Sequence, residues 1–156
     1  MTAPSVLEAL DAEVAVRRVM VAYMAACDAH DADAVAELFW PDAEAIGTRD
    51  GEEQWRCSSR EAVRADWAEA CARLTFCVHH LTNEEITVAG SSAEGRWCYY
   101  EPATNRGTLA AWTAGRYHHT LTERDGEWRF STFRIETMLQ APYDLGWVGD
   151  PIVELP

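Results

Sequence analysis

Apolar positions in the first half of the chain recur every three or four residues, which is the spacing of one face of a helix. The pattern predicts a helix over 5–27 and a short second helix over Asp33–Phe39, ended by Trp40-Pro41-Asp42. Ser58-Ser59-Arg60-Glu61 has the pattern of a capping box and opens a third predicted helix, which reaches about Leu74.

The second half of the chain is rich in β-branched and aromatic residues. Asp125-Gly126 separates the last two of these runs and is a strong hairpin signal. A short strand is expected at 43–48, followed by a polar loop at 49–56. Four longer strands are predicted at 76–88, 93–101, 109–123 and 128–139.

Three helices followed by long strands predict an α+β fold. The helices should pack on a strongly curved, mixed, mainly antiparallel sheet and leave a cone-shaped cavity, an α+β barrel suited to a small ligand. We expect one domain over 1–140. The proline-containing tail 141–156 has no regular period, and we expect it to cover the cavity mouth or to contact another subunit.

Charge and length narrow the class of partner. The chain has 156 residues and a net charge of −13, which opposes binding to nucleic acid or to an anionic membrane. No apolar run approaches the ~20 residues of a membrane span. The N-terminal sequence lacks the pattern of a signal peptide, so a cytoplasmic protein that acts on a small molecule is expected.

The basic residues and the cysteines limit the chemistry. All 13 basic residues are arginines, which excludes lysine Schiff bases. The five cysteines are odd in number and contain no Cys-x-x-Cys, so neither a disulfide framework nor a thiolate zinc site is indicated. The five histidines lack helical metal-ligand spacing, and there is no phosphate-binding glycine loop. We therefore predict no metal and no cofactor.

Two short motifs carry the candidate chemistry. Tyr23 and Asp28 lie near the end of the first predicted helix, and His79-His80 lies near the start of a predicted strand. An aspartate that holds a histidine in one tautomer can move protons at neutral pH. Neighbours in a strand point to opposite faces, so only one histidine of the pair can face the cavity, and His79 is preferred. The same argument applies to His118-His119, where the choice stays open.

The order of several motifs resembles the SnoaL-like branch of the nuclear transport factor 2-like superfamily, over about residues 8–138. The resemblance is closest to its cofactor-independent lyases, such as scytalone dehydratase and bile-acid 7α-dehydratase. It rests on Tyr23-x4-Asp28-x2-Asp31, Leu38-Phe39-x-Pro41-Asp42, His79-His80-Leu81-Thr82-Asn83, Gly95-Arg96-Trp97, Gly115-Arg116-Tyr117 and Asp125-Gly126-Glu127-Trp128.

The resemblance implies an Asp–His dyad made of Asp28 and His79, with Tyr23 as an active-site tyrosine. Two positions depart from the bile-acid enzyme. Thr137 stands where that enzyme has a late arginine, and its second tyrosine falls near Gly47. The substrate side of the pocket is therefore expected to differ.

The function expected from the sequence is dehydration of a hydroxylated cyclic small molecule, with His79 as the base and Tyr23 polarising the substrate. A polyketide cyclase or an isomerase would use the same proton transfers. The sequence is also compatible with a non-catalytic ligand-binding domain and with the small subunit of a ring-hydroxylating dioxygenase. Substrate contacts are expected from His118, Asn83, Trp97 and Tyr117, with the aromatic rings suited to a cyclic or aromatic compound.

The tail carries an excess of apolar side chains without periodicity. Exposed apolar surface costs about 25 cal/mol per Å², so a homo-oligomer is expected. The resemblance implies a trimer, and a dimer is the second choice. The apolar tail residues are Tyr143, Leu145, Trp147, Val148, Ile152, Val153 and Leu155.

Overall fold

The computed structural model describes residues 5–153, and the predictions that fall on 1–4 and 154–156 lie outside the described residues. Its helices are α1 (Val6–Asp28), α2 (Ala32–Glu37) and α3 (Arg60–Arg73). The strands are β1 (Phe39–Arg49), β2 (Glu52–Cys57), β3 (Leu74–Cys77), β4 (His80–Ala89), β5 (Ser92–Asn105), β6 (Leu109–Arg124) and β7 (Glu127–Pro142).

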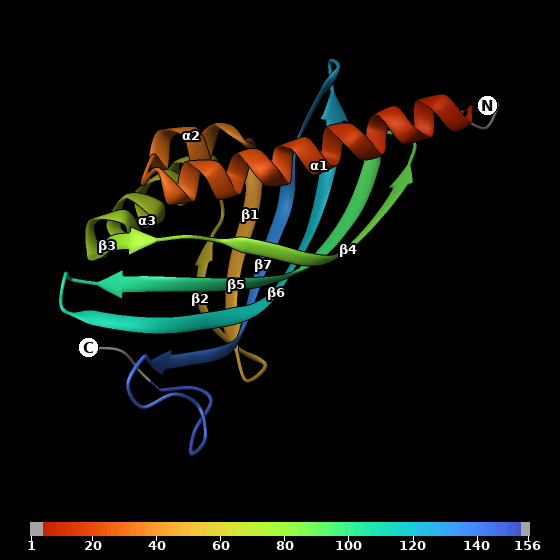
Figure 1. The fold of residues 1–156 in the computed structure, drawn as a ribbon. Coiled ribbons are helices and arrows are strands. Elements are labelled where there is room, and N and C mark those ends of the chain that lie inside the picture. The colour runs from red at the N-terminus through yellow and green to blue at the C-terminus, as the bar shows by residue number, and fades with distance from the viewer. Residues whose placement is uncertain (1–4, 154–156) are drawn as a thin grey trace.

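The strands form one curved sheet in the order β2-β1-β7-β6-β5-β3, and β4 also pairs with β5. The β1–β7 pair is parallel and the others are antiparallel, so the sheet is mixed and mainly antiparallel. All three helices lie on one side of the sheet, and the segment after β7 lies away from α1 (Figure 1). This is the α+β cone of the nuclear transport factor 2-like fold.

Side-chain hydrogen bonds at the helix starts explain where the helices begin. Ser5 and Glu8 form a capping box at α1. Asp31 accepts a hydrogen bond from the backbone N–H of Ala34 at 2.9 Å and so caps the second helix. Ser59 accepts from Ala62 at 3.1 Å at the start of α3. None of the described helices is long and apolar enough to cross a membrane.

Several sequence-based boundaries are wrong. The second helix was expected over Asp33–Phe39, but α2 ends at Glu37, and Trp40-Pro41-Asp42 lies within β1. The segment 49–56 was expected to be a polar loop, but β2 begins at Glu52 and pairs with β1, because Asp50-Gly51 makes a tight turn with both residues at positive φ. The strand expected over 76–88 is interrupted between β3 and β4. Alternating polar residues hide β2 from a composition-based prediction, since only one of its faces is covered.

The closed end of the cone is filled by side chains from the helices and from the concave face of the sheet. Tyr23 lies at its centre, with its ring centroid 4.7 Å from Phe133 and 5.9 Å from Phe130. The fully enclosed side chains include Val16, Met20, Tyr23, Val35, Phe39, Val63, Leu121, Phe130 and Phe133. This cluster fixes the end of α1 against the sheet.

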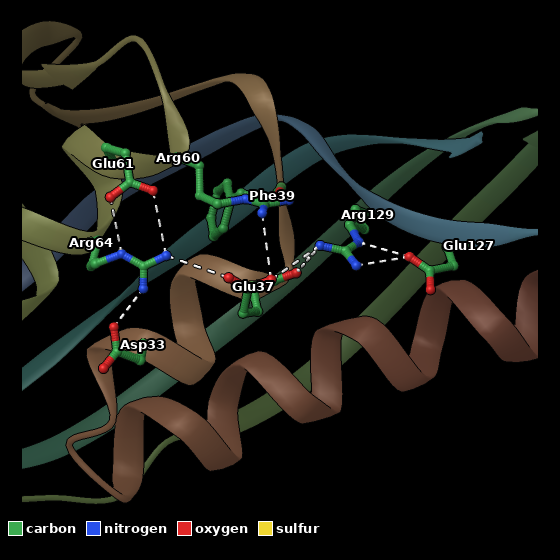
Figure 2. Close-up of polar contacts among 8 residues, drawn as sticks. All are labelled: Asp33, Glu37, Phe39, Arg60, Glu61, Arg64, Glu127 and Arg129. Atoms are coloured by element: carbon green, nitrogen blue, oxygen red, sulfur yellow. Dashed lines mark hydrogen bonds and ion pairs between the residues drawn. The ribbon is translucent and has the colours of Figure 1, made fainter. Parts of the chain in front are cut away.

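An ion-pair network joins the short helix α2 to α3 and β7 (Figure 2). Glu37 contacts Arg60 and Arg64 of α3 and Arg129 of β7, each at 3.4 Å. Arg64 also pairs with Asp33 of α2. Exposed pairs of this kind contribute little individually, about 0–1 kcal/mol. Together they hold the segment between α1 and β1 in place.

Candidate active site

The last residue of α1 meets the break between β3 and β4. The Asp28 carboxylate accepts a hydrogen bond from the backbone N–H of His79 at 3.0 Å, and its Oδ1 lies 2.7 Å from Nδ1 of the same residue. The helix dipole disfavours a carboxylate at this end of a helix, and the two contacts from His79 compensate for it. The hydrogen bond expected between Asp28 and His79 is therefore present.

Local backbone bonding explains the break in the strand. Pro102 of β5 lies opposite the break, and proline has no N–H to offer to a neighbouring strand. The backbone N–H of Val78 donates to the Pro102 carbonyl at 3.3 Å, and that of His79 turns to Asp28 instead. His79 thus lies between two strands rather than within one. Its neighbour His80 begins β4, is exposed and stacks on Tyr100.

The second nitrogen of His79 faces another carboxyl group. Nε2 lies 3.7 Å from Oε1 of Glu101, and the side chains are only 9% and 12% exposed. Burial raises the pKa of the Glu101 carboxyl, His79 opposes the rise, and Asp28 adds to it. Carboxyl groups thus flank both nitrogens of the imidazole. Sequence reasoning missed Glu101; its available signal was an isolated acid beside a proline in an aromatic strand.

These groups open into a pocket of about 230 Å³, which we call the inner compartment. Its ionisable side chains include those of Asp66, Arg73, His79 and Glu101. Burial raises the pKa of Tyr99 to about 12 and raises those of Tyr23 and Tyr117 well above the ordinary value, so all three keep their phenolic protons at neutral pH. Its aromatic walls come from Tyr23, Trp55, Trp67, Tyr99 and Tyr117.

Trp55 accounts for one departure from the bile-acid enzyme. A side chain at Gly47 would overlap its indole ring, so the glycine leaves the space that Trp55 occupies. β2 therefore supplies one of the aromatic side chains of the inner compartment.

A second hollow of about 500 Å³, the outer compartment, adjoins the first. Strand alternation explains the arrangement, because residues 99, 101, 103 and 105 of β5 all point to the same concave face. Tyr99 lines the inner compartment, and Ala103 and Asn105 line the outer one. The residues that line both compartments are Ala70, Arg73, Leu74 and Glu101.

One cluster near the dyad has the residue types of a metal site. Asp28, Cys77 and His79 each place one ligand atom within 4.8 Å of the others. Burial raises the pKa of the Cys77 thiol to about 12, and Glu101 and Asp28 add to the rise. When no metal is bound, the thiol therefore keeps its proton at neutral pH.

Three of the four expected substrate contacts lie off the inner compartment. Tyr117 lines it, but His118, the next residue of β6, points to the opposite face and lines a separate hollow with Arg96 and Arg134. The assignment of His118 to this cavity is therefore wrong. The predicted substrate contact from Asn83 is also wrong for this cavity, because Asn83 is exposed at an irregularity of β4.

Trp97 also fails to line the inner compartment, although it faces the concave side. It is 3% exposed and packs in the core, with its ring centroid 4.8 Å from His119. Core packing, rather than substrate contact, accounts for its position.

His119 is the inward member of its pair, but it is a core residue. It is 4% exposed, and neither ring nitrogen has a hydrogen-bond partner among the described residues. Its ring stacks on Phe133, with centroids 4.9 Å apart and an interplanar angle of 15°. Burial lowers the pKa of His119 from 6.5 to about 3, and His118 adds to the effect.

This histidine should make the fold sensitive to acid. Between pH 6.5 and about 3 the unfolded chain binds a proton that the folded chain excludes, so stability falls as the pH falls through this window. The effect is on the order of 1.4 kcal/mol per pKa unit. We expect His119→Phe to reduce the loss of stability between pH 7 and pH 5, measured by urea unfolding. An equal loss in both proteins would contradict this origin.

The comparisons with known proteins agree with this architecture. The sequence profile of the SnoaL-like domain matches residues 8–134. No functionally curated protein matches the chain.

Solved structures share the fold at low sequence identity. A protein described as an aromatic ring hydroxylase, from Novosphingobium aromaticivorans, is 22% identical, with a TM-score of 0.77 over 90% of this chain and 96% of its own. A protein described as a scytalone dehydratase, from the same organism, is 21% identical, with a TM-score of 0.76 over 94% of this chain and 97% of its own. A hexachlorocyclohexane dehydrochlorinase from Novosphingobium barchaimii is 20% identical, with a TM-score of 0.76 over 97% and 100%. At these identities the similarity establishes the fold.

Proposed function

Because the chain belongs to the SnoaL-like domain family, whose structural neighbours include a dehydratase and a dehydrochlorinase, we propose that it is a cofactor-independent dehydratase of a hydroxylated cyclic compound. The observation that carries the proposal is the buried imidazole of His79 between two carboxyl groups, 2.7 Å from Asp28 and 3.7 Å from Glu101. Both His79 and Glu101 line a pocket with aromatic walls.

Asp28 sets the tautomer of the His79 imidazole. Its carboxylate accepts the Nδ1–H hydrogen bond, which leaves the lone pair of His79 on Nε2, the nitrogen on the Glu101 side. Nε2 is then the base that removes a proton from the carbon next to a substrate carbonyl. Tyr23, at the wall of the same compartment, is the proposed donor to that carbonyl.

Glu101 supplies the acid for the second half of the reaction. Burial raises its pKa above that of an exposed glutamate, so its protonated form is more accessible, and that form can donate to the departing hydroxyl group as the C–O bond breaks. The electron pair of the broken C–H bond forms the C=C bond, and water leaves. The proton on Nε2 then passes to Oε1 of Glu101, which restores both groups without a co-reactant.

An isomerase or a polyketide cyclase would use the same first step and differ in where the proton is returned. Products separate these reactions. Incubation with a panel of cyclic β-hydroxyketones should give unsaturated ketones and water, detected by absorbance and mass spectrometry. Conversion to a positional isomer of unchanged mass would instead identify an isomerase.

We also propose that the protein is a homo-oligomer, a trimer or a dimer, assembled through the tail. No described tail residue after Pro142 lines either compartment, which favours a subunit contact over a lid. Leu145 is 70% exposed and Val148 is 99% exposed, while Tyr143 and Trp147 lie against Trp112. This apolar surface is costly to leave in water.

Charge in the tail should weaken the assembly. We expect Leu145→Asp and Val148→Asp to lower the mass measured by light scattering at micromolar concentration. Leu7→Asp, at an equally exposed apolar position of α1, is the matched control and should leave it unchanged. A monomeric parent protein would contradict the proposal.

A further inference from the structure

The outer compartment differs from the rest of this acidic molecule in the sign of its charge. Its lining contains Arg49, Arg73 and Arg106. Among residues 5–153, the only carboxyl group in that lining is Glu101, whose pKa is raised by burial. Three cations therefore face a hollow with a single carboxyl group, in a chain with a net charge of −13.

Two of these arginines have no carboxylate within ion-pair distance among the described residues, although acids outnumber arginines two to one in the chain. Arg49 makes only a long hydrogen bond of 3.4 Å from Nη2 to Gln140, and its buried Nε has no partner within the described part of the chain. Arg106 forms no ion pair there. Arg73 pairs with Glu69 at the surface. Arg49 is partly buried, and an isolated guanidinium in such a place is costly unless an anion satisfies it.

The backbone fixes two of these side chains at the same edge of the compartment. The backbone N–H of Arg106 donates to the carbonyl of Arg73 at 2.7 Å, so the β5–β6 turn is held against the end of α3. Arg49 lies across the hollow at the end of β1. Its charge also reaches the inner compartment, where it opposes the rise in the pKa of Tyr99 that burial causes.

We propose that the outer compartment binds a carboxylate or similar oxyanionic group of the ligand, while the ring of the same ligand occupies the inner compartment. Guanidinium groups suit oxyanions because several N–H donors share one plane. From Tyr99 of the inner compartment to Ala103 of the outer one the strand covers four residues, about 13 Å, so one elongated ligand can place a ring in one compartment and an anion in the other. The inference deepens the proposed function by naming the substrate class, a cyclic compound with an anionic arm.

A matched pair of probes tests this without any turnover. 4-Phenylbutanoate and 4-phenylbutanamide have nearly the same size and differ in charge. Calorimetric titration of the whole chain should show the acid binding about 10-fold to 100-fold more tightly than the amide. The difference should shrink as salt is added, because the interaction is between charges.

Variants locate the effect. Arg49→Gln should lower the affinity for the acid to that for the amide and leave the amide unchanged. Arg106→Gln, at an exposed turn, should reduce the same preference and tests the idea independently if Arg49→Gln folds poorly. Arg18→Gln on α1, outside both compartments, is the control and should bind like the parent protein.

Equal affinity for the two probes, binding of neither at millimolar concentration, or a preference that survives both Arg49→Gln and Arg106→Gln would overturn the inference. Asp28→Asn separates it from the proposed function. This variant should keep the preference for the acid, because the aspartate lines neither compartment. Loss of turnover with retained acid binding therefore tests catalysis, and loss of the preference tests the anion site.

Discussion

Replacement of His79 by glutamine is expected to lower turnover by about 10²–10⁴-fold, the usual contribution of one general acid–base group. The inner compartment would lose the only imidazole in its described lining. Asp28→Asn should have a loss of the same order. The oxygen of the asparagine side chain can still accept from the backbone N–H of His79. The NH₂ group of the same side chain donates to Nδ1, which places the imidazole proton on Nε2 and removes the lone pair of the base.

The neighbouring histidine gives the control for this experiment. His80→Gln changes the same residue type one position away, at an exposed site that stacks on Tyr100. It should keep turnover within about twofold of the parent, as surface substitutions have small effects. Steady-state kinetics of the three variants would contradict the dyad if His79→Gln and His80→Gln behaved alike.

Replacement of Glu101 by glutamine should produce the second large effect, a loss of turnover together with a change in the pH profile. If the protonated carboxyl donates to the leaving group, the rate of the parent falls as the pH rises through the raised pKa of Glu101. Glutamine cannot titrate. The variant should therefore retain a low rate that lacks this decline.

The free energy of unfolding should also depend on the protonation of Glu101, and Glu101→Gln should stabilise the protein at high pH although it lowers turnover. Between the ordinary value of 4.5 and its raised value in the fold, folded Glu101 keeps a proton that the unfolded chain has released. Its contribution to stability is therefore present at low pH and is lost as the pH rises through this window. Glu101→Gln should raise the melting temperature at pH 8 more than at pH 4. Lower stability with an unchanged pH profile would show a structural role instead.

Much of the fold follows from local pattern. The three helices, the hairpin at Asp125-Gly126 and the curved sheet were all predictable, because each depends on periodicity and turn chemistry within one segment. The strand β2 was not predictable, because its polar residues lie on an edge strand with little buried surface. The break at Val78-His79 was not predictable either, since it depends on Pro102 in another strand and on Asp28 at the end of α1.

Residues of the candidate site could be predicted only where they belong to a recognisable sequence motif or periodic pattern. Asp28, His79 and Tyr23 could be identified through the resemblance, and Tyr117 through the alternation of side chains along its strand. Glu101 was missed because its role depends on its distance from His79 across two strands. His118 was misplaced because a one-residue difference in strand register moves a side chain to the other face of the sheet.

The most direct test of the central claim, proton transfer by His79 held by Asp28, is hydrogen exchange at carbon. Cyclic β-hydroxyketones would be incubated with the protein in D₂O, and deuterium next to the carbonyl would be measured by NMR together with the unsaturated product. The account predicts exchange or product with the parent protein and with His80→Gln, and neither with His79→Gln or Asp28→Asn. Exchange that persists at the parent rate in His79→Gln would contradict it.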